Sequence, residues 1–166
     1  MLATLSLGGN TGDVAGAFCT TFKTLAAHSE VSLVARSSVW RTPPWGKLDQ
    51  PDFLNMCVSL KTTLTPRALL NVCLAIELAA GRERSERWGP RPLDIDIISY
   101  DNISVDEVGL VIPHPRAHER AFVLVPLAEI APDTMLAGER ASDLAAKCDR
   151  TGMVRDAGLT AEILAA

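Results

Sequence analysis

The five residues at positions 93–97, Leu-Asp-Ile-Asp-Ile, alternate strictly between apolar and acidic side chains. A period of two is typical of a β-strand, so the three apolar residues are expected to point into a core. Asp94 and Asp96 then share the opposite face, with Cα atoms about 6–7 Å apart. Two like charges on one face repel each other unless a cation lies between them, and Mg²⁺ would be such a cation. The alternative is a solvated strand face on which the aspartates bind nothing.

The segment that precedes this strand, residues 81–92, is rich in arginine. It carries Arg82, Arg84, Arg87 and Arg91, together with Trp88 and a Gly-Pro pair. A guanidinium presents a planar fork of N–H donors to phosphate oxygens, and closure of such a segment would exclude water from a bound nucleotide. We therefore expect a lid over a phosphate substrate. The alternative is a solvated loop in which the arginines pair with Glu83 and Glu86.

The length and composition of the chain favour one compact domain over residues 1–166. Hydrophobic residues make up 48% of the sequence and the mean hydropathy is +0.16, which excludes a disordered chain. The net charge of -4 argues against nucleic-acid binding, and no apolar run is long enough to span a membrane. The four scattered cysteines lack zinc-site spacing and are expected to be reduced core residues. The first residues lack the pattern of a secretory leader, so we expect a cytoplasmic protein. We also expect a monomer.

The predicted elements follow the order strand, helix, strand, strand, helix, strand. The strands are expected at residues 2–7, 31–35, 53–63 and 93–99, and the helices at about 14–28 and 66–80. This order is typical of an α+β fold with a ferredoxin-like βαββαβ sandwich, in which helices cover one face of an antiparallel sheet. The other face would be left for ligands and loops.

Three further regions complete the predicted fold. Residues 42–51 contain three prolines and are expected to form a long loop. An added hairpin is expected after a turn at residues 101–102, followed by a mostly helical segment at 117–130 that contains Pro126. The tail at 133–166 carries no informative motif and is expected to hold one or two short C-terminal helices, at about 142–149 and 160–165.

Two residues of the third predicted strand, Phe53 and Asn55, fall on the face opposite its core side chains. An exposed phenylalanine on an open sheet face could stack on a flat heterocycle, and asparagine offers both a donor and an acceptor. The alternative is that a helix or loop covers this face and buries both residues. Glu77 lies near the C-terminal end of the second predicted helix, where the helix dipole disfavours a negative charge. It is either a surface residue or a carboxylate that pairs with a loop arginine or holds a ligand.

Residues 113–122, Pro-His-Pro-Arg-Ala-His-Glu-Arg-Ala-Phe, form the last candidate cluster. Because the prolines restrict the backbone, His114, Arg116 and Arg120 are candidates to contact phosphate groups. Phe122 is a candidate for a second aromatic wall, although a lone histidine in such a segment is more often structural. The sequence contains no P-loop, no protein-kinase signature set and no nucleophile elbow.

Together these segments resemble the family of 6-hydroxymethyl-dihydropterin pyrophosphokinases, which act in folate synthesis. The resemblance covers about residues 5–132. Its most specific part is the run Arg87-Trp88-Gly89-Pro90-Arg91 that leads into the Asp-x-Asp strand. The other matching parts are Leu7-Gly8-Gly9-Asn10, Thr42-Pro43-Pro44, residues 50–55, Glu77 and residues 113–124.

The resemblance implies that the pterin hydroxymethyl oxygen attacks the β-phosphorus of ATP, takes up a diphosphate group and releases AMP, with two Mg²⁺ ions. The catalytic residues that it implies are Arg82, Arg91, Asp94 and Asp96, with the two aspartates also binding the metal. It places the pterin against Thr42, Pro43, Trp45, Phe53, Asn55 and Phe122. It places the nucleotide against Glu77, Arg84, Trp88, Arg91, His114 and Arg120.

Two other functions remain open from the sequence. A non-catalytic ferredoxin-like module could bind a small ligand for regulation, although it would not need paired aspartates beside a group of arginines. A metal-dependent phosphohydrolase could use Asp94 and Asp96 to release AMP or phosphate from ATP without any pterin.

Overall fold

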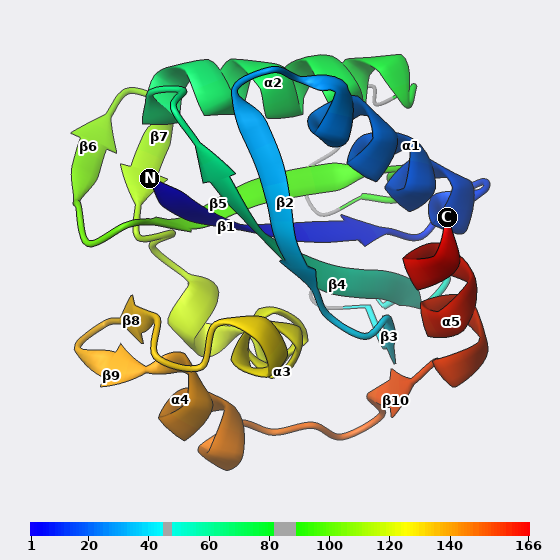
Figure 1. Ribbon diagram of the computed structural model, residues 1–166. Coiled ribbons are helices and arrows are strands. Elements are labelled where there is room, and N and C mark those ends of the chain that lie inside the picture. The colour runs from blue at the N-terminus through cyan, green and yellow to red at the C-terminus, as the bar shows by residue number, and fades with distance from the viewer. Residues whose placement is uncertain (45–47, 82–88) are drawn as a thin grey trace.

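The computed structural model describes residues 1–44, 48–81 and 89–166. A six-stranded sheet crosses the middle of the molecule, and every pairing in its described part is antiparallel (Figure 1). The order along the sheet is β10-β3-β4-β1-β5, and β2 pairs with the C-terminal half of β4. These strands are β1 (Leu2–Gly9), β2 (Val31–Arg36), β3 (Trp40–Thr42), β4 (Phe53–Thr62), β5 (Asp94–Tyr100) and β10 (Val154–Arg155).

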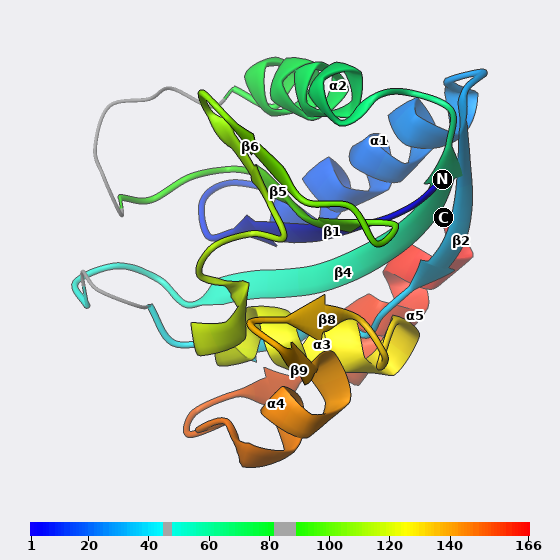
Figure 2. The ribbon, with the colours of Figure 1, turned by 90° about the vertical axis from the view of Figure 1, so that its left-hand side faces the viewer.

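Helices α1 (Val14–Ala27) and α2 (Pro66–Ala79) cover one face of the sheet (Figure 2). The side chains of Asp13 and Thr65 cap the two helices by accepting backbone N–H groups of the first turn. The apolar stripes of both helices pack on the buried residues of β1, β4 and β5, such as Leu5. This part of the fold confirms the predicted positions of both helices and their cover of one face.

The other face is also covered, by α3 (Ala121–Ile130) and α4 (Ala141–Lys147), so the prediction that it is left to ligands and loops is wrong. Cys57 of β4 and Ile98 of β5 are buried there against the two helices. Helix α3 buries five consecutive residues, from Val123 to Leu127. A helix that is apolar on nearly all sides needs partners on all sides, which the sheet and α4 provide.

One end of this second face stays accessible. Phe53, Asp94 and Asp96 lie there with partly exposed side chains, on the first residues of β4 and β5. The alternation predicted for β5 is confirmed, because Ile95 and Ile97 are buried in the core beneath α1 and α2. The sheet therefore presents the acidic residues away from that core, as the sequence indicates.

Several short elements are absent from the sequence-based prediction. Strand β3 ends at Thr42, the first residue of the predicted loop, and β10 lies in the tail that carries no motif. Runs of two or three residues are too short to show a period. The predicted hairpin is present as a separate two-stranded sheet. The remaining elements are β6 (Val105–Glu107), β7 (Leu110–Ile112), a 3-10 turn (Ala117–Glu119), β8 (Met135–Leu136), β9 (Glu139–Arg140) and α5 (Ala157–Ala165).

All four cysteines are free thiols. Cys57 and Cys73 are buried, as predicted, while Cys19 and Cys148 are partly buried. Burial raises the pKa of the Cys73 thiol to about 12, and it raises the pKa of Cys57 as well. Both buried thiols therefore remain protonated at neutral pH. Separately, none of the helices in the described ranges is long and apolar enough to cross a membrane.

Candidate active site

Asp94 and Asp96 lie on the edge strand β5, beside β1. Asp94 is opposite Gly8 and Asp96 is opposite Ser6. Their side chains are 22% and 37% exposed, so a ligand can reach both from solvent. Because Ile95 between them is buried, the strand holds the two carboxylates at a fixed spacing on one face.

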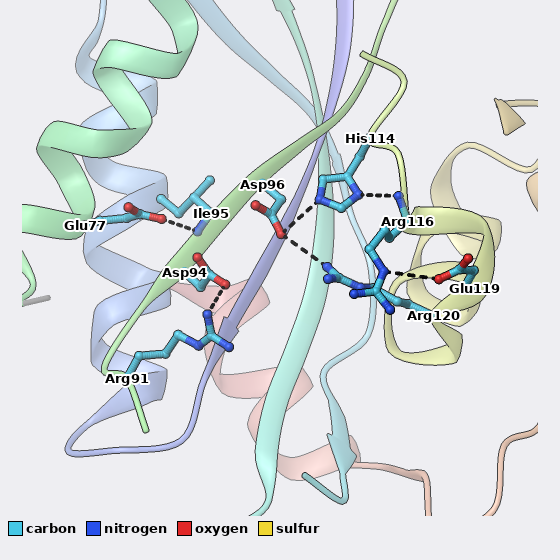
Figure 3. A network of polar contacts seen from close by, with 9 residues as sticks. All are labelled: Glu77, Arg91, Asp94, Ile95, Asp96, His114, Arg116, Glu119 and Arg120. Carbon is cyan, nitrogen blue, oxygen red and sulfur yellow. Dashed lines mark hydrogen bonds and ion pairs between the residues drawn. The ribbon is translucent and has the colours of Figure 1, made fainter. Parts of the chain in front are cut away.

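Basic side chains from two other segments face these carboxylates (Figure 3). Arg91, which precedes β5, places Nη1 2.8 Å from Oδ2 of Asp94. Arg120 Nη1 and His114 Nε2, from the segment after β7, each lie 3.8 Å from Oδ2 of Asp96. The candidate phosphate-binding residues thus meet the aspartates from both sides.

His114 is neutral at neutral pH. Burial, followed by the nearby charge of Arg120, lowers the pKa of its imidazole to about 4, while Asp94 acts in the opposite direction. Nδ1 of His114 accepts a hydrogen bond from the backbone N–H of Arg116 at 3.2 Å. The proton of the neutral ring is therefore on Nε2, the nitrogen that faces Asp96. The side chain of Arg116 itself contacts Glu119 at 3.2 Å.

Gly8, which has no side chain, lies on the sheet between Asp94 and the next polar residue, Asn55. It is opposite Asp94 on β5 and opposite Asn55 on β4. A Cβ atom at Gly8 would lie 2.8 Å from Oδ1 of Asn55. The Asn55 carboxamide is thus able to lie over Gly8, and it donates from Nδ2 to Oγ1 of Thr42 at 2.7 Å. Both Asn55 and Thr42 are buried, so this neutral pair is fixed in position.

The two aromatic candidates flank the aspartates. The guanidinium carbon of Arg91 lies 5.7 Å from the ring centre of Phe53, and that of Arg120 lies 5.7 Å from the ring centre of Phe122. Arg91 therefore lies beside both Asp94 and the Phe53 ring, and Arg120 lies beside both Asp96 and the Phe122 ring. The structure brings together the rings, the cations and the carboxylates that the sequence predicts as separate candidates.

Glu77 lies behind β5 and is almost fully buried, with 3% of its surface exposed. Its Oε1 accepts a hydrogen bond from the backbone N–H of Ile95 at 2.7 Å (Figure 3). A charged acceptor on a backbone N–H forms a strong hydrogen bond. Glu77 therefore fixes the residue between the two aspartates, and its predicted contact with the nucleotide stays a prediction.

Asn10 belongs to the run that resembles the family, but its pattern in the sequence does not predict a site role, and the structure shows it as an organising residue. Its Nδ2 donates to Oε1 of Gln50 at 3.1 Å and to the carbonyl of Pro51 at 3.0 Å. Its Oδ1 accepts from the backbone N–H of Arg91 at 3.0 Å, and its own N–H donates to the Arg91 carbonyl at 2.9 Å. One buried side chain thus joins the segment before β4 to the segment before β5. The signal in the sequence is the Gly-Gly-Asn turn at the end of the first strand.

Residues 4–132 match the family model described as 7,8-dihydro-6-hydroxymethylpterin-pyrophosphokinase, or HPPK. The chain belongs to the HPPK family. A 2-amino-4-hydroxy-6-hydroxymethyldihydropteridine pyrophosphokinase of Methylorubrum extorquens is 51% identical over 153 residues, which cover 92% of this chain and 97% of the relative. The enzyme of the same name from Bacillus subtilis is 43% identical over 129 residues, covering 78% and 77%.

Solved HPPK-DHPS structures share the fold. A crystal structure of HPPK-DHPS in complex with substrates has a TM-score of 0.72 and 13% identity, and the match covers 93% of this chain and 46% of that one. The Plasmodium falciparum HPPK-DHPS with SDX-DHP has a TM-score of 0.66 and 16% identity, covering 93% and 47%. The chain thus spans about half the length of these two structures.

The family confirms the activity that the sequence predicts. The chain is a pyrophosphokinase of folate biosynthesis that binds ATP and a pterin. As an enzyme of this family it is neither a non-catalytic ligand-binding module nor a phosphohydrolase. HPPK membership also agrees with the α+β sheet and helices of the structure.

Four of the predicted HPPK site residues, Trp45, Arg82, Arg84 and Trp88, lie outside the described residues. Pro43 is described and exposed. Within the described ranges, no three His, Cys, Asp or Glu side chains gather as a metal-binding group. Asp94 and Asp96 are the residues that could hold a metal ion here, and the pair suits Mg²⁺, because this ion commonly takes one or two carboxylates and fills its other positions with water and substrate phosphates.

Proposed function

We propose that this HPPK joins its two substrates at the accessible end of the sheet, where the pterin hydroxymethyl oxygen attacks the β-phosphorus of ATP and AMP leaves. The observation that carries the proposal is the row formed by Asp94, Gly8 and Asn55 on three neighbouring strands. The row supports the proposal because it brings the Asp94 carboxylate and the Asn55 carboxamide to one surface of the sheet. We also propose that the β5-β1-β4-β2 sheet with α1 and α2 is a ferredoxin-like sandwich.

The β5 side of the site would hold the triphosphate. Asp94 and Asp96 would bind two Mg²⁺ ions, which when bound neutralise phosphate charge and align the attacking and leaving oxygens. Arg91 and Arg120 already contact carboxylates, so each can exchange this contact for a phosphate oxygen. His114 would donate a hydrogen bond from its Nε2–H to the nucleotide. Arg82, Arg84 and Trp88 are proposed to close over the phosphates, and Glu77 to support the nucleotide side.

The β4 side would hold the pterin. Phe53 and Phe122 provide two aromatic faces for the flat ring. Because Nδ2 of Asn55 is bonded to Thr42, the carboxamide is oriented with Oδ1 available to accept an N–H of the pterin. Thr42, Pro43 and Trp45 are proposed to complete the polar edge of this pocket.

The proposed reaction depends on alignment rather than on a strong base. Neutral His114 cannot accept a proton at Nε2, the atom that faces Asp96. Holding an alcohol and a phosphorus atom in line supplies a large part of the rate enhancement in such transfers. The fixed carboxamide on one strand and the fixed carboxylates on another serve this alignment.

The decisive experiment is incubation of the protein with ATP, Mg²⁺ and 6-hydroxymethyl-7,8-dihydropterin, followed by mass spectrometry of the products. We expect AMP and a pterin diphosphate in equal amounts, and neither product when Mg²⁺ is chelated. AMP or phosphate formed equally well without the pterin would contradict the proposal.

We propose further that the enzyme is a cytoplasmic monomer. The four free thiols support a reducing compartment. Light scattering coupled to size-exclusion chromatography should give the mass of one chain, 17.8 kDa. A mass of about twice that value at micromolar concentration would contradict the monomer.

A further inference from the structure

The C-terminal tail, which lies beyond the family match at residues 4–132, is joined to the sheet next to the proposed pterin site. Strand β10 pairs with β3, with Val154 opposite Arg41 and Arg155 opposite Trp40 (Figure 1). Without β10, the three-residue strand β3 would be the edge of the sheet, and short edge strands are weakly held. The tail therefore completes the sheet at this position.

Contacts from the tail reach consecutive residues of the β3 segment. The backbone N–H of Asp156 donates to the Val39 carbonyl at 2.9 Å, and the Val39 N–H donates to Oγ1 of Thr160 at 2.9 Å. Nη2 of Arg41 lies 3.0 Å from Oδ2 of Asp156. Nε of Arg155 donates to Oγ of Ser38 at 2.7 Å. The segment before Thr42 is thus held residue by residue.

The tail also lies against Pro43, one of the residues proposed to hold the pterin. Gly152 has a φ of +78°, and a Cβ atom added there would lie 3.0 Å from Cγ of Pro43. Only glycine adopts this backbone without strain and leaves room for the proline ring. The close approach at Gly152 therefore seats the backbone of the tail on Pro43.

Strand β3 connects the tail to the Asn55 carboxamide, which is proposed to bind the pterin. Thr42 is opposite Phe53 on β4, Trp40 is opposite Asn55, and the Thr42 hydroxyl accepts from Asn55 at 2.7 Å. From the other side, Glu129 of α3 accepts hydrogen bonds from the Ser38 N–H and the Trp40 indole N–H, each at 2.7 Å. Strand β3 is thus held between α3 and the tail.

We propose that residues 152–156, the tail strap, are positioning residues for pterin binding: they fix β3 so that Thr42 orients the Asn55 carboxamide. This proposal rests on the pterin site described under the proposed function. The tail strap touches neither β5 nor the aspartates in the contacts described, so it should act on pterin affinity and leave nucleotide affinity unchanged.

The test variant is Val154→Pro. Because the N–H of Asp156 points to β3, the N–H of Val154, two residues earlier, points the same way. Proline removes this donor, while the Val154 side chain is 60% exposed and contributes little to the core. We expect KM for the pterin to rise about tenfold, equivalent to ~1.4 kcal/mol, with KM for ATP and kcat within about twofold. Val154→Ala keeps the N–H and should behave like the parent.

Gly152→Ala is the second variant, for use if Val154→Pro does not fold by circular dichroism. Its methyl group must displace the Pro43 ring, so the pterin KM should again rise selectively. An unchanged pterin KM in the folded variants, or an equal rise in both KM values, overturns the role of the tail strap. Asn55→Ala, measured in parallel, separates the two proposals: if it leaves the pterin KM unchanged, the pterin site itself is wrong and the strap proposal falls with it.

Discussion

The β5 side and the β4 side of the site are built in opposite ways. On β5, partly exposed carboxylates face basic groups from separate segments, at 2.8 and 3.8 Å. On β4, buried Asn55 bonds to buried Thr42, and both are neutral. Charges near solvent can exchange one partner for another at low cost, whereas a buried neutral pair keeps one geometry. The comparison suggests that the β5 side adapts to its ligand and that the β4 side is formed in advance.

Replacing a carboxylate on β5 should have the largest effect. We expect Asp96→Ala to lower kcat by roughly 10³-fold or more, because it removes a proposed metal ligand and the charge stabilisation that the metal provides. The side chain is 37% exposed, so the thermal midpoint should change little. Asp106→Ala, at an exposed aspartate of β6, is the control in steady-state assays. Near-normal turnover of Asp96→Ala would remove this residue from the mechanism.

Replacing the carboxamide on β4 should affect binding rather than turnover. Asn55→Ala should raise the pterin KM by about 10–100-fold, since a lost hydrogen bond in a buried site costs on the order of 1–3 kcal/mol. KM for ATP should stay within about twofold. The exposed Asn102 provides a matched control as Asn102→Ala. A loss of kcat with unchanged pterin KM would break the distinction between the two sides.

Glu77 connects the β5 side to the core and should show a smaller, graded effect. Glu77→Ala leaves the buried N–H of Ile95 without its acceptor, which should lower the free energy of unfolding by about 1–3 kcal/mol. Glu77→Gln keeps an acceptor and should lose less stability in urea titrations. If the glutamine variant matched the alanine variant in stability, the negative charge rather than the hydrogen bond would be the contribution of Glu77.

The smallest expected effect is a pH dependence at the tail strap. The Leu159 N–H, followed by Arg41, lowers the pKa of Asp156 below its usual value. The ionised carboxylate therefore stabilises the fold at neutral pH, and this contribution is lost as pH falls through the lowered pKa. Asp156→Asn should cost at most about 1 kcal/mol at pH 7, because exposed pairs are screened, and the difference from the parent should fade towards pH 3. A difference that is constant between pH 7 and 3 would contradict the role of the charge.

The features predicted from sequence are those that a single element expresses by itself. The alternation around Asp94 and Asp96 defines a strand and its two faces, and the helix predicted from residue 66 begins at that residue, Pro66. A similar alternation in β4 places Phe53 and Asn55 on the face of the sheet that carries the proposed site. Strong local periodicity is thus enough to identify candidate side chains for the site.

The features that escape prediction need contacts between distant residues. Strand β10 has two residues, and its partner Arg41 lies more than 110 positions away from Val154 along the chain. Asn10 joins Gln50 and Arg91, and nothing near Asn10 in the sequence names these partners. The apolar sequence of α3 indicates that the helix is buried, but that its partner is the second face of the sheet follows only from the folded chain.

Arg91 lies near both a ring and a carboxylate, because its guanidinium is over Phe53 and bonded to Asp94. A ligand that occupies the space beside Phe53 changes the surroundings of the same guanidinium that a triphosphate would engage. In the proposed site, each substrate would then alter the affinity of the enzyme for the other by an identical factor, because such coupling is reciprocal at equilibrium. This single arginine would make the two proposed pockets thermodynamically dependent without any movement of the sheet.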